Sequence, residues 1–212
     1  SNEMNIEHPA KVPIDALRAN VSVSFEESRA MPPQVYTSKE FNKTELEQIF
    51  KKDWFCVGRA SALAKPGDYV TCELAEQPVI VLRDQNHTLR AMSNVCRHRM
   101  STLLNGSGSA KVIVCPYHAW TYNLDGSLRG APAMNANKAF CKNQYKLPTI
   151  ACEEWLGWVF INLNPDAKPV SQELTEVQEL IKGYDMANYT QTFFEEHLWD
   201  TNWKILAENF ME

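Results

Sequence analysis

Two mixed pairs of metal-binding side chains lie close together in this sequence. Residues 96–98 (Cys-Arg-His) and 115–118 (Cys-Pro-Tyr-His) each supply one thiol and one imidazole, and 16 residues separate them. Thiolates and imidazoles are ligands for iron–sulfur clusters and for zinc. In one type of [2Fe–2S] cluster, two histidines replace two cysteines on one of the irons. The spacing therefore predicts that Cys96 and Cys115 bind one iron and that His98 and His118 bind the other.

This ligand set has consequences for electron transfer. Two thiolates and two neutral imidazoles leave the oxidised cluster close to neutral, whereas four thiolates would leave it negatively charged. Adding an electron to the neutral cluster costs less, so its reduction potential is higher than that of an all-cysteine cluster. An outer imidazole also loses a proton more readily while the cluster is oxidised. We therefore expect electron uptake and proton uptake to be coupled.

Structural zinc is the alternative for these four residues, because zinc also accepts two cysteines and two histidines. Zinc sites usually pair cysteine with cysteine and histidine with histidine, at the spacing of a zinc finger. Both pairs are mixed here, and the first pair has a single intervening residue. The pattern therefore favours iron–sulfur chemistry over zinc.

The flanking residues extend the pattern to a known family. Residues 116–126 (Pro-Tyr-His-Ala-Trp-Thr-Tyr-Asn-Leu-Asp-Gly) resemble the second ligand loop and following hairpin of the Rieske non-haem iron oxygenases, specifically of their large (alpha) subunit. The resemblance runs from about residue 32 to residue 212. Most members carry glycine at the positions of Met100 and Ala119, so this chain adds a side chain beside each ligand loop without losing a ligand.

The last residues resemble the opening of the family's catalytic helix. In those enzymes this helix continues into two histidines, which hold a mononuclear Fe(II) together with a later carboxylate. No histidine follows His197 in this sequence. We therefore expect a fragment of a protein roughly twice as long, inactive for oxygenation by itself, with the Fe(II) site in the missing C-terminal part. By resemblance, Glu212 is the carboxylate that bridges the cluster of one subunit and the Fe(II) of its neighbour in a homotrimer.

The resemblance implies the electron-transfer portion of an oxygenase component. Electrons would come from an NAD(P)H-dependent reductase or a ferredoxin, and O2 would be used to hydroxylate, dihydroxylate or demethylate a small molecule. Glutamate at position 212 is similar to members that act on quaternary ammonium compounds, and an aromatic substrate is the close alternative. Two functions of other classes stay open: a stand-alone Rieske ferredoxin-type electron carrier and a zinc-stabilised interaction module.

Three neighbours of the ligands allow more than one interpretation. Arg97 and Arg99 flank His98, and their positive charge would favour the reduced cluster and attract an acidic electron donor. Two solvated loop arginines are the alternative. Trp120 would shield the cluster, line a subunit contact or pack as an ordinary aromatic residue.

Composition excludes several other classes of protein. The chain has 212 residues, 44% of them hydrophobic and 22% charged, as in an ordinary globular protein. Its net charge of −5 argues against a nucleic-acid surface. We expect no membrane span and a cytoplasmic location, since no apolar run is long enough and the N-terminal residues lack the basic-then-apolar pattern of a signal sequence. The four cysteines outside the motif are predicted to be small buried hydrophobic residues: Cys56, Cys72, Cys141 and Cys152.

Short β-rich runs between turn residues dominate the middle of the chain. They predict an α+β fold, mainly β, with an antiparallel β-sandwich Rieske domain and flanking helices. The predicted domains are an N-terminal arm and helix (1–44), the Rieske domain (45–165), and a linker helix with the truncated start of the catalytic domain (166–212). The expected strands are residues 54–58, 68–74, 79–82, 89–95, 111–114, 120–122, 127–129, 149–152 and 158–163.

Helical periodicity occurs only outside this region. Residues 38–52 predict a helix capped by Ser38, and residues 171–183 and 202–212 predict two more. Residues 1–35 are polar and carry four prolines, so we expect a loosely packed arm or a short helix there. Residues 190–200 are predicted to form a further strand.

Overall fold

The computed structural model describes residues 10–211, which divide into two compact units. One unit is continuous, from Phe50 to Thr192, and contains all of the strands assigned among the described residues. The other combines the chain up to Ile49 with the segment from Phe193 onward, and it is helical. None of the helices between residues 10 and 211 has the length and apolar character needed to cross a bilayer.

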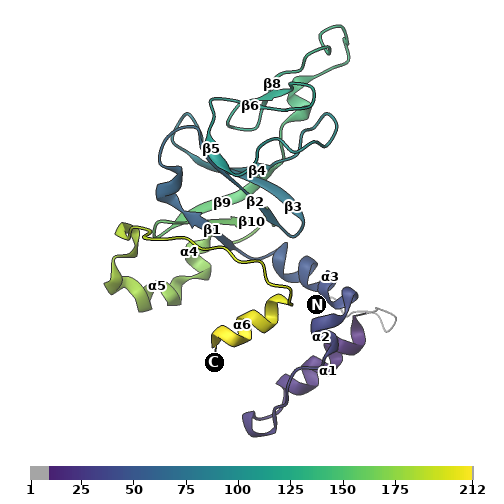
Figure 1. The fold of residues 1–212 in the computed structure, drawn as a ribbon, viewed down its shortest axis with the longest axis vertical. Coiled ribbons are helices and arrows are strands. Elements are labelled where there is room, and N and C mark those ends of the chain that lie inside the picture. The colour runs from purple at the N-terminus through teal and green to yellow at the C-terminus, as the bar shows by residue number, and fades with distance from the viewer. Residues whose placement is uncertain (1–9, 212) are drawn as a thin grey trace. The chain divides into compact units, whose positions relative to one another are not determined.

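The β unit is built on one curled antiparallel sheet of seven strands, in the order β1-β10-β9-β4-β3-β2-β5 (Figure 1). A smaller sheet, β6-β7-β8, lies at one end of it. All of the recorded pairings are antiparallel, as the short connections between strands predict. The strands are β1 (Phe55–Arg59), β2 (Asp68–Leu74), β3 (Gln77–Arg83), β4 (Leu89–Ser93), β5 (Ser107–Ser109), β6 (Ile113–Val114), β7 (Thr121–Tyr122), β8 (Leu128–Gly130), β9 (Thr149–Trp155) and β10 (Trp158–Asn162).

Strand β3 divides the interior into two cores. Its residues Val79, Ile80, Val81 and Leu82 are all fully buried. Because successive side chains of a strand point to opposite faces, Ile80 and Leu82 join one core while Val79 and Val81 join the other. The first core also contains Cys96 and Cys115, so it is the core that positions the candidate ligands.

The predicted fold class, mainly antiparallel β with flanking helices, is confirmed. The hairpin expected after the second ligand loop forms as well, with its turn at Asp125-Gly126: Gly126 has a φ of +85°, which glycine adopts without strain, and the Asn123 amide donates to Ser127 O. Strand β5 was missed because Ser107-Gly108-Ser109 carries no apolar residue. It forms because β2 pairs with it.

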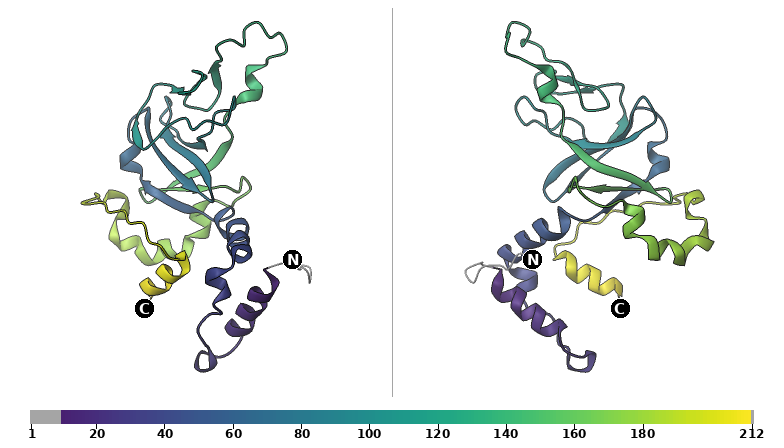
Figure 2. Two further views of the ribbon diagram at one scale, coloured as in Figure 1. Left: turned by 45° about the vertical axis from the view of Figure 1, so that its right-hand side comes forward. Right: turned by 180° about the vertical axis from the view of Figure 1, so that it is seen from behind.

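The helical unit contains α1 (Lys11–Val21), α2 (Gln34–Thr37), α3 (Lys39–Glu45) and α6 (Trp203–Met211), seen from two sides in Figure 2. Helix α3 has the predicted cap, since the Phe41 amide donates to Ser38 Oγ at 3.1 Å. It passes into a π-helical turn over Leu46–Phe50. Of the two possibilities predicted for residues 1–35, a loosely packed arm or a short helix, the described residues show the helix, α1.

Three details differ from the sequence predictions. Residues 190–200 form no strand among the described residues. The helix predicted over 171–183 is divided into α4 (Val170–Glu173) and α5 (Thr175–Ile181), because Leu174 between them has a non-helical ψ of 17°. Cys56 and Cys141 are exposed rather than buried, whereas Cys72 and Cys152 are partly buried.

Candidate metal centre

The two ligand loops have the same backbone pattern. In the first, the Met100 amide donates to Cys96 O at 3.0 Å and the Cys96 amide donates to Ser101 O at 2.8 Å. In the second, the Ala119 amide donates to Cys115 O at 3.0 Å and the Cys115 amide donates to Trp120 O at 2.8 Å. Each loop therefore closes into one tight turn that begins at its cysteine.

Secondary structure holds both loops at the same end of the β unit. The first loop follows β4, and its ends are joined by buried Asn94, whose side chain donates to Leu104 O and accepts from the Leu104 amide. The second loop connects β6 to β7, which pair with each other. Two loops from separate parts of the fold are thereby fixed within one core.

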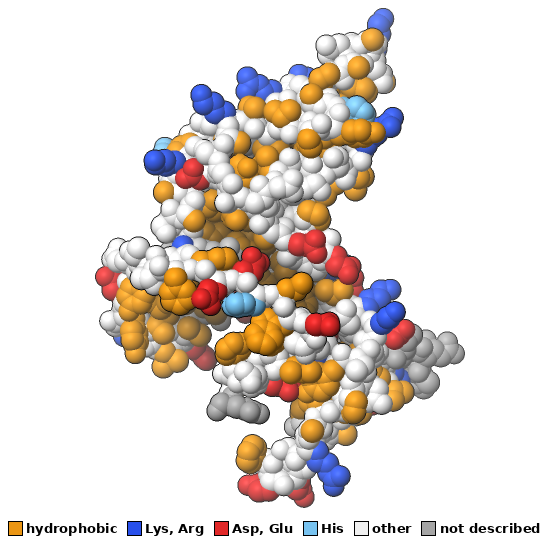
Figure 3. Space-filling model, viewed as in Figure 1, with side chains coloured by type: hydrophobic (Ala, Val, Ile, Leu, Met, Phe, Trp, Pro, Cys, Tyr) orange, Lys and Arg blue, Asp and Glu red, His pale blue; other side chains and the backbone are white. Residues whose placement is uncertain are grey.

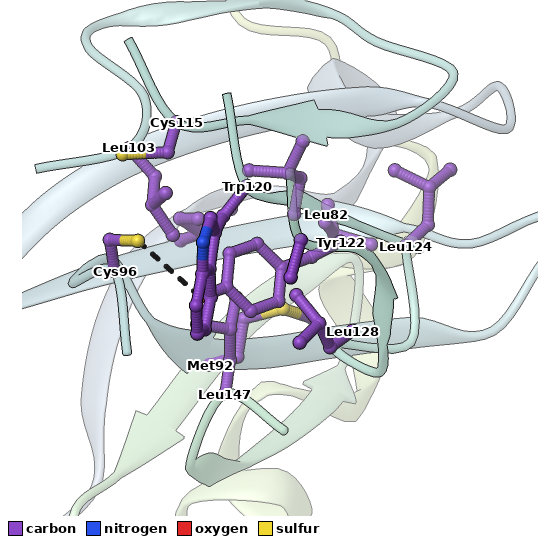
Figure 4. Close-up of a cluster of buried hydrophobic side chains, with 13 residues drawn as sticks. Leu82, Met92, Cys96, Leu103, Cys115, Trp120, Tyr122, Leu124, Leu128 and Leu147 are labelled. Atoms are coloured by element: carbon purple, nitrogen blue, oxygen red, sulfur yellow. Dashed lines mark hydrogen bonds between the residues drawn. The ribbon is translucent and has the colours of Figure 1, made fainter. Parts of the chain in front are cut away.

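The four candidate ligands are ordered by depth. Cys96 and Cys115 are 0% and 3% exposed, His98 is partly buried, and His118 is exposed. The rings of His98 and His118 lie next to each other, with centroids 4.8 Å apart at an interplanar angle of 71°. Figure 4 shows both cysteines at one edge of the apolar core. The cysteine sulfurs thus lie in the protein interior and the imidazoles lie nearer to solvent. This arrangement fits two metal ions, one bound by sulfur and one by imidazole, better than a single ion bound by all four side chains.

Trp120 holds one face of His98. Its indole is buried and stacks on the imidazole, with centroids 4.7 Å apart and planes within 10°. Burial lowers the pKa of His98, and the neighbouring His118 and Arg99 lower it further. The neutral imidazole, the form that binds metal, is therefore favoured. Of the interpretations considered for Trp120, the structure shows the packed core aromatic, and its indole also contacts the candidate ligand His98.

Tyr122 was not singled out from the sequence, yet it reaches Cys96. Its buried hydroxyl lies 3.4 Å from Cys96 Sγ and accepts the Arg97 amide at 2.9 Å (Figure 4). Because that amide occupies one lone pair, the hydroxyl proton is free to point to the sulfur. Burial and the contact with Cys96 raise the pKa of Tyr122, so the hydroxyl stays protonated. No local pattern signals this role, since Tyr122 lies 26 positions after Cys96 in the chain.

In the described part of the chain, the remaining arginine and histidine positions considered in the sequence make no side-chain contact that assigns them a role at the candidate site. Arg97 and Arg99 are exposed on either side of His98. His87 is an exposed turn residue, as expected, and His197 is exposed near Glu195. His8 and Glu212 lie outside the described residues, although α6 ends at Met211, immediately before Glu212.

Comparison with known proteins places this arrangement in a family. Residues 53–150 match the Rieske [2Fe–2S] domain, a domain that implies such a cluster. The chain is 39% identical over 191 residues to the carnitine monooxygenase oxygenase subunit of Acinetobacter pittii, covering 85% of this chain and 50% of that protein. It is 32% identical over 212 residues to the glycine betaine monooxygenase oxygenase subunit of Pseudomonas aeruginosa, covering 98% and 47%.

Solved structures agree with these matches. A quaternary ammonium Rieske monooxygenase in complex with L-carnitine has a TM-score of 0.77 and 38% identity, covering 85% of this chain and 52% of the other. Naphthalene 1,2-dioxygenase from Rhodococcus sp. has a TM-score of 0.80 and 28% identity, covering 92% and 46%. The chain spans about half the length of the relatives it matches. It therefore belongs to the Rieske non-haem iron oxygenases and corresponds to the N-terminal, Rieske-containing part of their alpha subunits.

Proposed function

We propose that Cys96, His98, Cys115 and His118 hold the [2Fe–2S] cluster. The observation that carries this proposal is the depth order of the four side chains, with both sulfurs buried and both imidazoles toward solvent. When bound, such a cluster accepts and releases one electron at a time. The protein positions the inner sulfurs in its core, orients His98 with Trp120 and offers a hydroxyl to Cys96 through Tyr122.

Analysis of metal and sulfide tests this assignment. Anaerobically purified protein should contain about two irons and two labile sulfides per chain and show the red-brown colour of the cluster. Cys115→Ser should abolish both, whereas Cys141→Ser, a change at an exposed cysteine outside the ligand loops, should leave both intact. Stoichiometric zinc without sulfide would instead support the zinc-stabilised module.

The whole protein is proposed to be the oxygenase component of a Rieske monooxygenase. Residues 45–165 would form the electron-transfer domain. Residues 1–44 would form an N-terminal arm and helix, and residues 166–212 a linker helix with the truncated start of the catalytic domain. Electrons would arrive from an NAD(P)H-dependent reductase or a ferredoxin and continue to a mononuclear Fe(II), with Glu212 as the bridging carboxylate in a homotrimer. The similarity to oxygenase subunits of known Rieske enzymes supports this role.

A quaternary ammonium compound is the proposed substrate class. The carnitine and glycine betaine enzymes, at 39% and 32% identity, are closer in sequence than the alpha subunit of benzene 1,2-dioxygenase from Pseudomonas putida, at 28%. The test supplies the whole protein with a reductase and measures product formation, NADH oxidation and, for demethylation, formaldehyde release. Tight coupling to an aromatic compound, with none to betaine-type compounds, would replace this substrate class and leave the cluster assignment intact.

A further inference from the structure

A basic loop lies next to the candidate metal centre. It begins within β8, at Arg129, and continues through Lys138, Lys142 and Lys146, and all four of these side chains are exposed. No acidic residue occurs between residues 126 and 152. Figure 1 shows this segment projecting from the end of the β unit, beyond β6 and β8. The loop therefore presents positive charge to solvent, and Asp125, just before it in the chain, interacts with the charge of Lys146.

The charge of this region opposes that of the rest of the chain. Residues 96–146 contain seven Lys and Arg side chains and one Asp, a net charge of +6. The chain as a whole carries −5, so the other residues together carry −11, the difference between −5 and +6. Figure 3 shows Lys and Arg side chains spread over the same end of the β unit. A field of this sign attracts negatively charged macromolecules and speeds their encounter.

Aromatic rings connect the loop to the cluster ligand. The loop encloses an open hollow of about 660 Å3, lined in part by Met134, Phe140 and Lys142. The ring of Phe140 packs edge-on against Trp120, with centroids 5.6 Å apart, and Tyr145 contacts Trp120 in the same way at 5.4 Å. Trp120 in turn stacks on His98. Ring contacts thus run without interruption from the hollow to a proposed ligand.

We propose that the loop of residues 129–146 is the docking surface for an acidic electron-donor protein with an iron–sulfur or flavin centre. This inference rests on the proposed electron-transfer function, and it adds where the electron donor binds and that the donor is negatively charged. Positive charge steers the donor to the loop, and the hollow brings it within reach of Phe140. One electron then passes from the reduced donor to the oxidised cluster, and no bond forms or breaks.

A donor explains more of the observations than a second copy of the chain does. The acidic remainder of another copy would also satisfy the positive charge. An interface between copies, however, does not require aromatic contact with a ligand of the cluster. The coincidence of positive charge, a hollow and ring contacts to His98 is what an electron entry site needs.

The experiment measures cluster reduction by stopped flow. The donor probe is a plant-type [2Fe–2S] ferredoxin of net negative charge, whose potential lies below that of Rieske clusters, so transfer is downhill. Lys138→Glu/Lys146→Glu should lower the second-order rate at low ionic strength by about tenfold or more, and salt should reduce the difference. Lys168→Glu/Lys182→Glu makes the same change of charge at exposed sites near α4 and α5, and it should keep the parental rate. Phe140→Leu should lower the limiting rate at saturating donor and leave the salt dependence unchanged.

Two controls separate docking from damage to the cluster. Every variant must retain the iron, sulfide and visible spectrum of the parent; their absence in the parent itself would refute the proposed function rather than the docking surface. The cationic radical of methyl viologen should reduce Lys138→Glu/Lys146→Glu at least as fast as the parent, because the altered loop no longer repels a positive reductant.

Three outcomes would overturn the proposal. In the first, ferredoxin reduces Lys138→Glu/Lys146→Glu as fast as the parent but reduces Arg97→Glu/Arg99→Glu more slowly, which would place the docking surface beside His98 instead. The second is a slower rate accompanied by a changed oligomeric state in size-exclusion chromatography, which would make the loop an interface between copies. The third is a parental limiting rate for Phe140→Leu, which would remove the aromatic connection.

Discussion

Met100 and Ala119 occupy equivalent positions in the two ligand loops. Each lies four residues after its cysteine, donates its amide to that cysteine's carbonyl oxygen at 3.0 Å and has a positive φ, 59° and 56°. Residues other than glycine adopt this left-handed conformation at a cost of about 1–2 kcal/mol. Both loops therefore hold a strained residue beside a proposed ligand.

Met100→Gly should stabilise the folded protein. The substitution removes the strain at φ +59°, while the flexibility of glycine in the unfolded chain costs about 0.5–1 kcal/mol, so the free energy of unfolding should rise by about 0.5–1 kcal/mol. Little burial is lost, because Met100 is 77% exposed. Urea unfolding of the cluster-loaded protein measures the change. The control is Lys138→Gly, which should not raise the free energy of unfolding because Lys138 has no positive φ. A lower free energy of unfolding in Met100→Gly would show that Met100 is not strained.

Tyr122→Phe should lower the reduction potential of the cluster. The Tyr122 hydroxyl lies 3.4 Å from Cys96 Sγ, and hydrogen bonds to the ligand sulfurs are one of the factors that set these potentials. Such a bond stabilises the reduced, more negative cluster, so its loss shifts the potential downward. Protein-film voltammetry provides the measurement, and Tyr69→Phe, which removes a hydroxyl elsewhere in the β unit, serves as control. An unchanged potential in Tyr122→Phe would show that the hydroxyl does not donate to Cys96.

Lys204→Met should destabilise the helical unit. Lys204 Nζ lies 2.7 Å from Glu45 Oε1, both side chains are nearly buried, and the contact is an ion pair rather than an aligned hydrogen bond. The rings of Tyr36, Phe41 and Trp203 lie 5.3–5.7 Å from the ammonium group. Removing Lys204 leaves a buried carboxylate without its partner, at a cost of about 3–5 kcal/mol.

Hydrogen exchange of the α3 and α6 amides measures this effect. Protection should fall in Lys204→Met and return in the double variant Glu45→Leu/Lys204→Met, because apolar residues often replace a buried ion pair without loss of stability. Equal loss of protection in the single and double variants would show that the packing of the lysine chain, not its charge, stabilises the unit.

Asp84 should make the β unit sensitive to acid. Burial alone would raise the pKa of Asp84, but hydrogen bonds from Arg90 at 2.6 Å and from the Thr88 and Asn86 amides outweigh it and lower the pKa. A carboxyl whose pKa is lower in the folded state adds stability above its unfolded pKa of about 3.9. That stability is lost as pH falls through the lower, folded pKa.

Asp84→Asn should therefore cost about 1.5–3 kcal/mol at neutral pH, as expected for hydrogen bonds to a charged group. The difference from the parent should shrink as pH falls below about 4, where the parental carboxyl becomes protonated. Urea unfolding across this pH range measures it, with the exposed Asp53→Asn as control. A cost independent of pH would assign the effect to the shape of the turn and not to its charge.

Sequence reasoning succeeded where structure depends on neighbours in the chain. Strand β2 covers the predicted residues 68–74, the Ser38 cap forms, and the turn at Gly126 closes the expected hairpin. Alternating apolar residues, a capping hydroxyl and a glycine in a turn act within a few residues, so their effect is visible without the fold.

Prediction from the sequence failed where a strand forms only by pairing with a distant part of the chain. Residues 190–200 carry the β-favouring residues Phe193, Phe194 and Trp199, yet no strand forms there among the described residues. Residues 107–109 carry no apolar residue and do form one, because β2 pairs with them. In both segments, the presence or absence of a pairing strand from a distant part of the chain decides whether a strand forms. The β-propensity of a segment carries no information about such a partner.

The sequence by itself determined which residues are candidates for chemistry: two Cys–His pairs, at the spacing expected for an iron–sulfur cluster, on loops between short strands. Only the tertiary structure decided how deeply each candidate ligand is buried, which ring stacks on His98 and which hydroxyl lies beside Cys96. The choice of candidate ligands follows from residue type, which is local. Burial and contact follow from a core that joins β3, β4 and β7, and residues far apart in the chain meet there only after folding.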